Sequence, residues 1–396
     1  MEGFFSESVW DAKEPTTGVP LCGACGLAAE CRSPKMPVHG HGRQGILIVG
    51  DRPSAASDKA GRHWAGESGT YVGKLLRKHD ISAANDVWWS NALICHGKQT
   101  SDRVRYCRPN MTSLIEELNP RHIICMGYPA LLSVVGKFFD KEDLGQPQRW
   151  DGLNIPNQRP NCWVTCLDSP SQLDSRDGMR QQFFEHYLDT ALETCQGRPW
   201  EPAPPDYRKQ VRCETNPEKA AKLIDQITAT GGLCSFDFET NMLHSNTQLS
   251  RIVSCAITQQ GRRTLAYPWH GSAIEATGRF LKSPVPKVAA NMKFEDRWCL
   301  STFGHPVRNV VYDTNLGAHL IDNRPHITSV KFQAYALLGE PEYNAYIEPY
   351  FQSDAPNLPN TIDQIALPDL LLYNGLDAVL EYFIAIKQMA ELNYTY

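Results

Sequence analysis

The sequence predicts an α/β protein with two domains, each built around its own sheet. In the first half, short apolar runs alternate with helix-like segments, which favours a largely parallel sheet with helices on both faces. In the second half, strand-like runs come first and helices follow, which favours a mixed sheet. Between the halves, GRPWEPAPPDYRKQ at 197–210 has four prolines, which favour extended chain. The expected boundaries are 1–196 for the first domain, 197–212 for a linker and 213–396 for the second domain.

The first domain is expected to alternate strands with helices. Short apolar runs bounded by turn residues are typical of buried strands in a parallel sheet. Its expected strands are GILIVG (45–50), DVWWSNALIC (86–95), HIICMG (122–127) and CWVTCL (162–167). Its expected helices are GTYVGKLLRKH (69–79), NMTSLIEEL (110–118), PALLSVVG (129–136) and a long one over about 176–193.

The second domain is expected to open with a helix near 217–229. Its strand-like runs are LCSFDFE (233–239), RIVSCAIT (251–258), RRTLAYPW (262–269) and KVAANM (287–292). Several helices follow, and PDLLLYNGLDAVLEYFIAIKQM (368–389) reads as one long helix because its apolar residues recur at helical spacing.

Composition limits the classes of function. A net charge of −5 gives no chain-wide signature of nucleic-acid binding, so any DNA contact must come from local patches and metals. KLLRKH (74–79) and Arg103, Arg105 and Arg108 are candidate phosphate contacts or ordinary solvated faces. No run approaches the roughly 18 apolar residues of a membrane span. The N-terminus lacks the features of a signal peptide, so we expect a cytoplasmic protein whose 13 cysteines are thiols or metal ligands.

Acidic residues in the second half form a candidate metal site. Asp237 and Glu239 lie two apart in an apolar run, so on a strand both carboxylates project from one face. Tyr373 and Asp377 lie four apart in the long helix and share one helical face. Glu295 and Asp296 in ANMKFEDRW supply a further carboxylate. Two Mg²⁺ or Mn²⁺ ions about 3.5–4 Å apart could be held by such a set and would support phosphodiester cleavage.

A lone D-x-E is common in strands, but D-x-E-T, then N-x-x-x-[DE], then Y-x-x-x-D in this order is far more specific. Residues 213–396 resemble the proofreading 3′–5′ exonucleases with a DEDD set and a tyrosine, as attached to family-A DNA polymerases. VVYDTNLGAHLIDNR (310–324) and SVKFQAYALLG (329–339) look like the helices that follow the second motif in phage members. The resemblance implies a ribonuclease-H-like fold.

The resemblance also implies roles for individual residues. Asp237, Glu239 and Asp377 would hold the metal that activates water, Asp237 would bridge to a second metal, and Tyr373 would orient the water. The family's second motif is N-x-x-x-D, whereas position four after Asn291 is Glu295 here, with Asp296 next to it. We expect Glu295 to be the ligand and keep Asp296 as the alternative.

Four cysteines in the first half form a second candidate metal site. Cys22 and Cys25 make a C-x-x-C pair, and Cys95 and Cys107 lie close together in the sequence. Four thiolates satisfy either tetrahedral zinc or a [4Fe–4S] cluster, and spacing alone does not choose between them. Cys31 is an alternative ligand, and four ordinary buried thiols are the remaining alternative.

The residues around the cysteines carry a second resemblance. C-x-x-C-x-L, VHGHGRQGILIVGDRP (38–53), DKAGRHWAGESGTYVGKLL (58–76) and SNALIC (90–95) resemble the family-4 uracil-DNA glycosylases, which carry a [4Fe–4S] cluster. The resemblance covers about residues 18–195. It implies a glycosylase-like parallel-sheet domain, with the cluster held by Cys22, Cys25, Cys95 and Cys107.

The glycosylase pocket departs from that family. Asn91 matches the asparagine that reads uracil, and Trp64 stands where a phenylalanine stacks on the flipped base. Asp51 replaces the motif glutamate, Ser54 replaces a glycine, and Ser169 replaces the histidine of H-P-S. A serine cannot become cationic to support the departing uracil anion, so we expect DNA binding without efficient uracil excision.

Together these features predict a DNA-processing protein of replication or repair. Its first half would be an iron–sulfur, glycosylase-like module, and its second half a metal-dependent 3′–5′ exonuclease that acts on single-stranded or frayed 3′ ends. One alternative is an enzyme that both excises uracil and trims ends. Another is a non-catalytic accessory that positions a family-A DNA polymerase. The chain is expected to be a truncated polymerase or a separate subunit that proofreads in trans.

Overall fold

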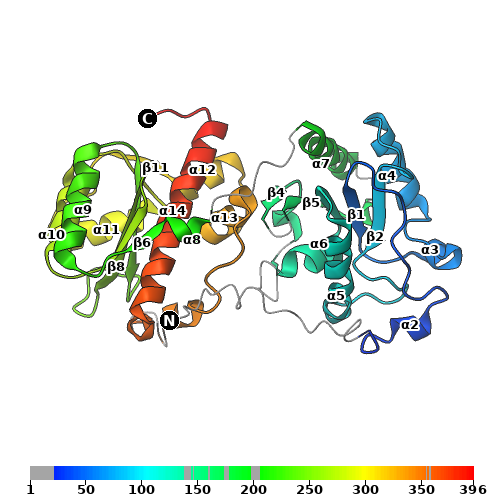
Figure 1. The fold of residues 1–396 in the computed structure, drawn as a ribbon, viewed down its shortest axis with the longest axis horizontal. Coiled ribbons are helices and arrows are strands. Elements are labelled where there is room, and N and C mark those ends of the chain that lie inside the picture. The colour runs from blue at the N-terminus through cyan, green and yellow to red at the C-terminus, as the bar shows by residue number, and fades with distance from the viewer. Residues whose placement is uncertain are drawn as a thin grey trace. The chain divides into compact units, whose positions relative to one another are not determined.

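The structure is a computed structural model and describes residues 22–137, 144–145, 147–158, 161–173, 178–197, 206–353, 355 and 358–396. The chain divides into two compact units, taken mostly from residues 10–204 (the N-terminal unit) and residues 205–396 (the C-terminal unit). Each unit has one sheet with helices packed on it (Figure 1). The predicted α/β class is therefore confirmed.

The N-terminal unit contains a five-stranded sheet in the order β2-β1-β3-β5-β4. The first four strands of that order pair in parallel, and β4 pairs antiparallel to β5 at one edge. β1 and β3 are buried along their whole length, as expected for central parallel strands with both faces covered. The strands are β1 Ile46–Gly50, β2 Val87–Asn91, β3 His122–Met126, β4 Asn154–Asn157 and β5 Cys162–Leu167.

Side-chain caps mark the start of two helices of this unit, α3 and α5. α5 starts at Ser101, nine residues before the predicted start, because the Thr100 hydroxyl caps its first turn by accepting from the Arg103 N–H at 3.2 Å. The predicted strand over 86–95 ends at Asn91. Part of the predicted last helix, 176–177, lies outside the described residues. The helices are α2 Leu27–Glu30, α3 Ala55–Ala60, α4 Glu67–Lys78, α5 Ser101–Leu118, α6 Tyr128–Val134 and α7 Gly178–Gly197, with 3-10 turns η1 Val135–Lys137, η2 Pro147–Arg149 and η3 Pro170–Gln172.

The C-terminal unit contains a six-stranded mixed sheet in the order β11-β10-β7-β8-β9-β6. β7, β8 and β9 form an antiparallel meander, while β6, β10 and β11 join it in parallel. The mixed sheet was predicted, but β6 was not. Residues 206–212 of the predicted linker form α8 and most of β6, and residues 198–205 lie outside the described part. The strands are β6 Val211–Cys213, β7 Cys234–Thr240, β8 Ile252–Gln259, β9 Thr264–Pro268, β10 Lys287–Ala289 and β11 Val310–Asp313.

Helices cover both faces of this second sheet (Figure 1). α9, α10 and α11 bury one face in a core that includes Phe236, Leu265 and Phe280. The long helix α14 lies on the opposite face, against Ala256 and Ala266, whose small side chains let the helix approach closely. The helices are α8 Tyr207–Gln210, α9 Pro217–Thr230, α10 Ser272–Lys282, α11 Met292–Phe303, α12 Thr314–Ile321, α13 Val330–Leu338 and α14 Leu367–Glu391, with 3-10 turns η4 Glu348–Phe351 and η5 Ile362–Gln364.

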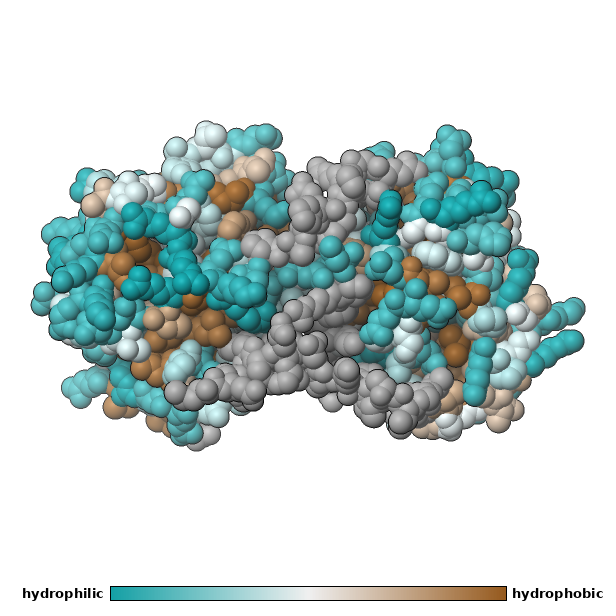
Figure 2. Space-filling view, viewed as in Figure 1, coloured by the Kyte–Doolittle hydropathy of each residue, from teal (hydrophilic) through white to brown (hydrophobic). Residues whose placement is uncertain are grey.

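The surface shown in Figure 2 is mostly hydrophilic, with hydrophobic side chains in separate patches on each unit. Among the helices that the structure describes, none combines the length and the apolar character needed to cross a bilayer.

Candidate active site and metal centres

β7 presents Asp237 and Glu239 on the sheet face that α14 covers. The phenylalanines that alternate with them, Phe236 and Phe238, belong to the core on the opposite face. The Ser235 hydroxyl donates to a backbone carbonyl of α14 at 2.6 Å, which ties the strand to the helix. The strand alternation therefore directs both carboxylates toward the helix that carries Asp377.

Asp237, Glu239 and Asp377 come together as one acidic trio. Each offers a carboxylate oxygen, and these oxygens lie within 4.8 Å of one another. Glu239 and Asp377 are only 8% and 4% exposed. Carboxylates brought this close inside a protein repel one another strongly, so the arrangement calls for a compensating cation.

Both carboxylate oxygens of Asp377 accept hydrogen bonds from side chains. The Lys331 ammonium, on α13, donates to Oδ2 at 2.7 Å, and the Tyr343 hydroxyl donates to Oδ1. The Lys331 nitrogen also lies 4.9 Å from the ring centroid of Tyr373. These contacts fix the carboxylate and place a positive charge beside the trio.

Asp237 is held by a second polar chain that starts on β8. The Ser254 hydroxyl donates to Asn374 Oδ1 at 3.0 Å, and Asn374 Nδ2 donates to Asp237 Oδ2 at 2.7 Å. Asn374 is fully buried on α14, so its amide orientation is set by these two bonds. These two hydrogen bonds fix the Asp237 carboxylate through its Oδ2.

The structure separates the two candidates of the second acidic motif. Glu295, on α11, is 2% exposed, and its Oε2 has no hydrogen-bond partner among the described residues. The charges of Asp237 and Glu239 both act on it. Asp296 instead accepts the Val307 N–H at 2.7 Å, away from the trio. Asn291 is exposed, with a left-handed φ of 55°, and begins the helix that directs Glu295 inward.

Tyr373 lies one helical turn before Asp377 on α14 and is 5% exposed. Its ring packs near Phe351 and Tyr343, with centroid separations of 5.5 and 6.0 Å. Burial raises its pKa, and so do the nearby charges of Asp377 and Glu239, so the phenol stays protonated and able to donate.

The protonation of the acidic site follows from its burial. Burial, and then the charge of Asp377, raises the pKa of Asp237 to about 7. Burial and the neighbouring carboxylates also raise the pKa values of Glu239 and Glu295. Oxygen ligands, mutual repulsion and an unpartnered Glu295 oxygen are what a hard divalent cation would satisfy. The residues present therefore fit a divalent metal.

We expect the stabilisation of the protein by Mg²⁺ to increase with pH. The folded-state pKa of Asp237, about 7, lies above its ordinary value of 3.8, so without metal the folded chain retains this proton more tightly than the unfolded chain. That favours folding as pH falls through 7, whereas metal binding requires the carboxylate. The rise in melting temperature on adding Mg²⁺ should be larger at about pH 8 than at about pH 6. An equal rise at both pH values would contradict this, and Asp237→Asn should reduce the difference.

Sequence reasoning missed several residues of this site. Lys331 and Tyr343 contact Asp377, and Asn374 contacts Asp237, but none stands in a motif that points to these contacts. Glu381 is different: it is 1% exposed, and the charges of Asp237 and Asp377 raise its pKa after burial itself. Glu381 lies one turn after Asp377 on the buried face of a long apolar helix, and this position in the sequence indicates a residue of the same site.

In the N-terminal unit, Cys22, Cys25, Cys95 and Cys107 line one small hollow. They come from the turn before α2, the segment after β2 and the helix α5, and apolar residues and amides complete the wall: Leu27, Leu93, Ile94, Tyr106 and Asn110. The Lys35 N–H donates to Cys95 Sγ at 3.2 Å and Asn110 Nδ2 to Cys107 Sγ at 3.6 Å. Such bonds stabilise sulfur that carries negative charge.

The spacing of the thiols bears on the kind of metal that they could hold. In a tetrahedral zinc site with Zn–S bonds of about 2.3 Å, the sulfurs lie about 3.8 Å apart. Among the described residues, no three cysteine sulfurs lie within 4.8 Å of one another. A cuboidal cluster spaces its thiolates more widely, because each binds a different iron. Cys31 does not line the hollow but lies beside Cys95, as their electrostatic interaction shows.

The four predicted pocket residues of this unit lie near the carboxyl ends of its parallel strands. Asp51 follows β1 and Ser169 follows β5, and their side chains interact. The Ser169 hydroxyl forms a hydrogen bond with Ser171 Oγ at 3.0 Å, and Asp51 Oδ1 has no hydrogen-bond partner among the described residues. Burial raises the pKa of Asp51 to about 6. The serine therefore contacts the acid and is 4% exposed, which leaves it little access to a ligand.

Asn91 and Trp64 are also engaged within the protein. Asn91 Nδ2 donates to His63 Nδ1 at 2.7 Å, while His63 Nε2 donates to the Met36 carbonyl at 3.1 Å. The Trp64 indole donates to a backbone carbonyl of β2 at 2.8 Å. A Cβ at Gly50 would lie 2.5 Å from both Asn91 Oδ1 and the Trp64 ring, so glycine is needed there. The Asn91 amide nitrogen is therefore engaged by a neighbouring imidazole.

Comparison with known families separates the chain into the same two halves. Residues 37–192 match the uracil DNA glycosylase superfamily, and residues 210–380 match a 3′–5′ exonuclease family. The chain joins a glycosylase-like region to a 3′–5′ exonuclease region. Both resemblances seen in the sequence are thereby confirmed.

Individual relatives match one region each. A type-4 uracil-DNA glycosylase of Pyrobaculum aerophilum is 31% identical over 127 residues, which are 30% of this chain and 64% of that protein, just under two thirds of its length. Escherichia coli RNase D, an exoribonuclease, is 14% identical over 46% of this chain and 45% of its own, with a TM-score of 0.37. Brucella melitensis NrnC bound to pGG is 13% identical over 46% of this chain and 79% of its own, with a TM-score of 0.35.

Proposed function

We propose that the chain is a metal-dependent 3′–5′ DNA exonuclease whose glycosylase-like region serves as a DNA-binding module. The observation that supports this most is the acidic trio Asp237, Glu239 and Asp377, with the unpartnered Oε2 of Glu295 facing it from α11. Trimming 3′ ends would give the chain a role beside a DNA polymerase in replication or repair. We propose that it acts in the cytoplasm.

Each side chain has a distinct part in this proposal. Two divalent cations supply the stabilisation of the attacking and leaving oxygens in phosphodiester hydrolysis. Asp237, Glu239 and Asp377 would hold one of them, and Asp237 with Glu295 the other. Tyr373 would donate from its protonated phenol to orient the attacking water. Lys331, Tyr343 and Asn374 would be positioning residues that fix the carboxylates, as their hydrogen bonds to Asp377 and Asp237 support.

A hollow close to these motifs in the sequence offers a place for the end of a DNA strand. It encloses about 540 Å³. Its Leu243 follows Glu239 by four residues and is 78% exposed, and its Arg297 follows Glu295 by two. An exposed leucine suits contact with a base and a guanidinium suits contact with a phosphate. The other lining residues are His244, Ser245, Asn246, Leu300 and Ser301.

The test of this proposal is the direction and metal dependence of DNA degradation. Single-stranded DNA labelled at its 5′ end should yield a ladder that shortens from the 3′ end with Mg²⁺ or Mn²⁺, and no ladder with a chelator. The same strand labelled at its 3′ end should release labelled mononucleotide first. Loss of the label from the 5′ end first, or equal degradation with a chelator, would exclude the proposal.

We propose that Cys22, Cys25, Cys95 and Cys107 hold a [4Fe–4S] cluster. The apolar wall of their hollow and the N–H donors to Cys95 and Cys107 support this. The cluster would link the turn before α2 to the segment after β2 and to α5. It would therefore act as a structural link within the glycosylase-like region.

We expect no appreciable uracil release from this chain. The Asn91 amide donates to His63, and the Ser169 hydroxyl is buried and hydrogen-bonded to Ser171. Losing one preorganised donor typically lowers a rate by roughly 10²–10³. Uracil-containing single-stranded DNA should therefore give no alkali-labile sites, and Ser169→His alone should not create them while Asp51 remains. Robust excision that Asn91→Ala abolishes would instead show an enzyme with both activities.

A further inference from the structure

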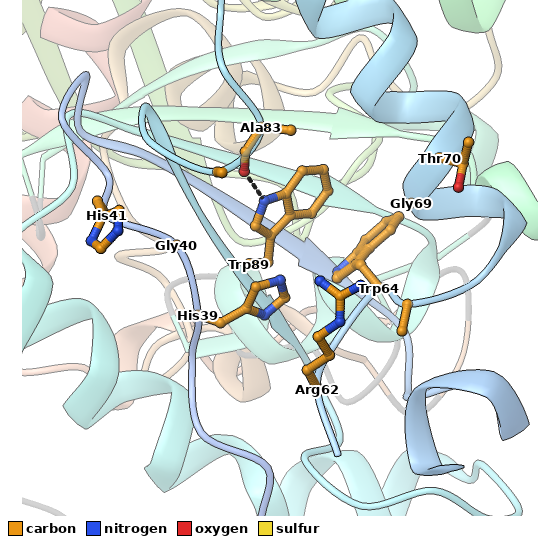
Figure 3. A pocket seen from close by; sticks show the side chains of 11 residues that line it. His39, Gly40, His41, Arg62, Trp64, Gly69, Thr70, Ala83 and Trp89 are labelled. Carbon is orange, nitrogen blue, oxygen red and sulfur yellow. Dashed lines mark hydrogen bonds between the residues drawn. The ribbon is translucent and has the colours of Figure 1, made fainter. Parts of the chain in front are cut away.

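A cleft on the glycosylase-like region carries aromatic side chains and one guanidinium, and no acidic side chain lines it. It encloses about 440 Å³ and lies between the segment before β1, the loop before α4 and the edge strand β2 (Figure 3). This volume is within the roughly 300–1,000 Å³ of small-molecule sites. The residues that line it include His39, His41, Arg62, Trp64, Thr70 and Trp89.

The aromatic rings of the cleft are fixed in place. The Trp89 indole is 4% exposed and donates to the Ala83 carbonyl at 2.6 Å. The Trp64 ring lies 5.3 Å from Trp89, and the His39 ring lies 6.4 Å from Trp89 and nearly parallel to it, at 14°. Rings that are already ordered lose little entropy when a ligand stacks on them.

The backbone beside the cleft is also constrained. Trp64 has a left-handed φ of 57°, which is uncommon and costly for a residue with a bulky side chain. The first turn of α4 approaches it so closely that a Cβ at Gly69 would lie 2.0 Å from the Trp64 carbonyl oxygen. This close packing holds the strained Trp64 and keeps its ring in the wall of the cleft.

The charges of the cleft suit one phosphate. Arg62 and His41 are exposed, and in the view of Figure 3 the Arg62 guanidinium lies near the rings of His39 and Trp64. Burial and the charge of Arg62 lower the pKa of His39, so its imidazole is neutral near pH 7 and offers a flat face. A single guanidinium suits the one negative charge of a phosphodiester better than a triphosphate.

Three of the four residues of the predicted glycosylase pocket lie outside the cleft. Trp64 lines it, but Asp51, Asn91 and Ser169 do not. A base held here would therefore be bound without its glycosidic bond lying against those groups.

We propose that this cleft binds one unpaired base of single-stranded DNA, stacked against Trp64 and His39, with the adjacent phosphodiester on Arg62. Base stacking on aromatic side chains is the usual way in which proteins bind single strands without reading their sequence. The proposal rests on the proposed DNA-binding role of the glycosylase-like region and gives that role a location. It does not depend on the exonuclease chemistry.

The test uses the full chain with Asp237→Ala and no divalent metal, so that DNA stays intact. Binding of a labelled oligothymidylate is measured by fluorescence anisotropy at several salt concentrations. Arg62→Glu and Thr70→Glu should each raise Kd about 10-fold, whereas Lys98→Glu, an exposed lysine outside the cleft, should change Kd little. Arg62→Gln should lower the slope of log Kd against log salt by about 0.7, the value for one phosphate contact on a single strand.

Crosslinking separates this cleft from the exonuclease region. A strand with 5-iodouracil should crosslink to peptides that contain Trp64, His39 or Trp89, and Arg62→Glu should suppress those products. Crosslinks only to residues 205–396, or cleft variants that bind like the parent, would overturn the cleft proposal while leaving the exonuclease intact. Equal competition by free thymidine monophosphate would also overturn it, in favour of a mononucleotide site. If the parent binds no single-stranded DNA, the proposed DNA-binding role fails as well.

Discussion

Asp237→Ala is expected to lower the rate of Mg²⁺-dependent 3′–5′ degradation by at least about 10³-fold. Asp237 is the member of the trio proposed to contact both cations, and metal stabilisation of a transition state is worth several kcal/mol, or about three powers of ten in rate. The measurement is a single-turnover rate on 5′-labelled single-stranded DNA. Activity within 10-fold of the parent would rule out the two-metal assignment.

Two neighbouring residues supply a matched control for that experiment. Glu295→Gln should reduce the rate strongly, because it removes a buried carboxylate that faces the trio. Asp296→Asn should have little effect, since an amide oxygen can still accept the Val307 N–H. Tyr373→Phe should fall between these limits, because it removes a water-orienting hydroxyl but no metal ligand. The reverse order for Glu295 and Asp296 would make Asp296 the ligand.

Cys95→Ser is expected to remove the iron and unfold the glycosylase-like region at a temperature where the parent is folded. Prepared without oxygen, the parent should be brown and contain about four irons per chain, since four thiolates bind one [4Fe–4S] cluster. Iron content, visible absorbance and thermal unfolding check this together. Stoichiometric zinc without colour would show a Cys₄ zinc site instead.

Cys31→Ser is the control for the cluster variants. Cys31 lies beside Cys95 but does not line the hollow, so its loss should leave the iron content unchanged. If Cys31→Ser loses iron and Cys22→Ser keeps it, the ligand set must be reassigned. Exonuclease activity should survive in Cys95→Ser, because its residues lie in the other compact unit.

Local sequence patterns were sufficient to predict most strands and the acidic trio. Asp237 and Glu239 share a strand face, and Tyr373 and Asp377 share a helix face, so spacing alone places each pair. The antiparallel edge strand β4 was missed because NIPN has only one strongly apolar residue. The early start of α5 was missed because Pro109 reads as a helix end, whereas the Thr100 cap begins the helix well before it.

The partners of the acidic residues could not be predicted, because they come from segments far away in the sequence. Lys331 is 46 residues from Asp377, and Ser254 is 120 from Asn374, so no local pattern links them. The choice of Glu295 over Asp296 also depends on which side of α11 faces the sheet. The engagement of Asn91 by His63 likewise arises only when the loop before α4 folds against the end of β2.

The ion pair between Lys331 and Asp377 has a practical consequence for handling the protein. Because the lysine ammonium remains beside the trio, part of the negative charge is already balanced when metal ions are removed. A chelator should therefore inhibit reversibly: dialysis back into Mg²⁺ should restore activity without a refolding step. Lys331→Met should retain a fold in Mg²⁺ but lose more activity during storage in the chelator than the parent does.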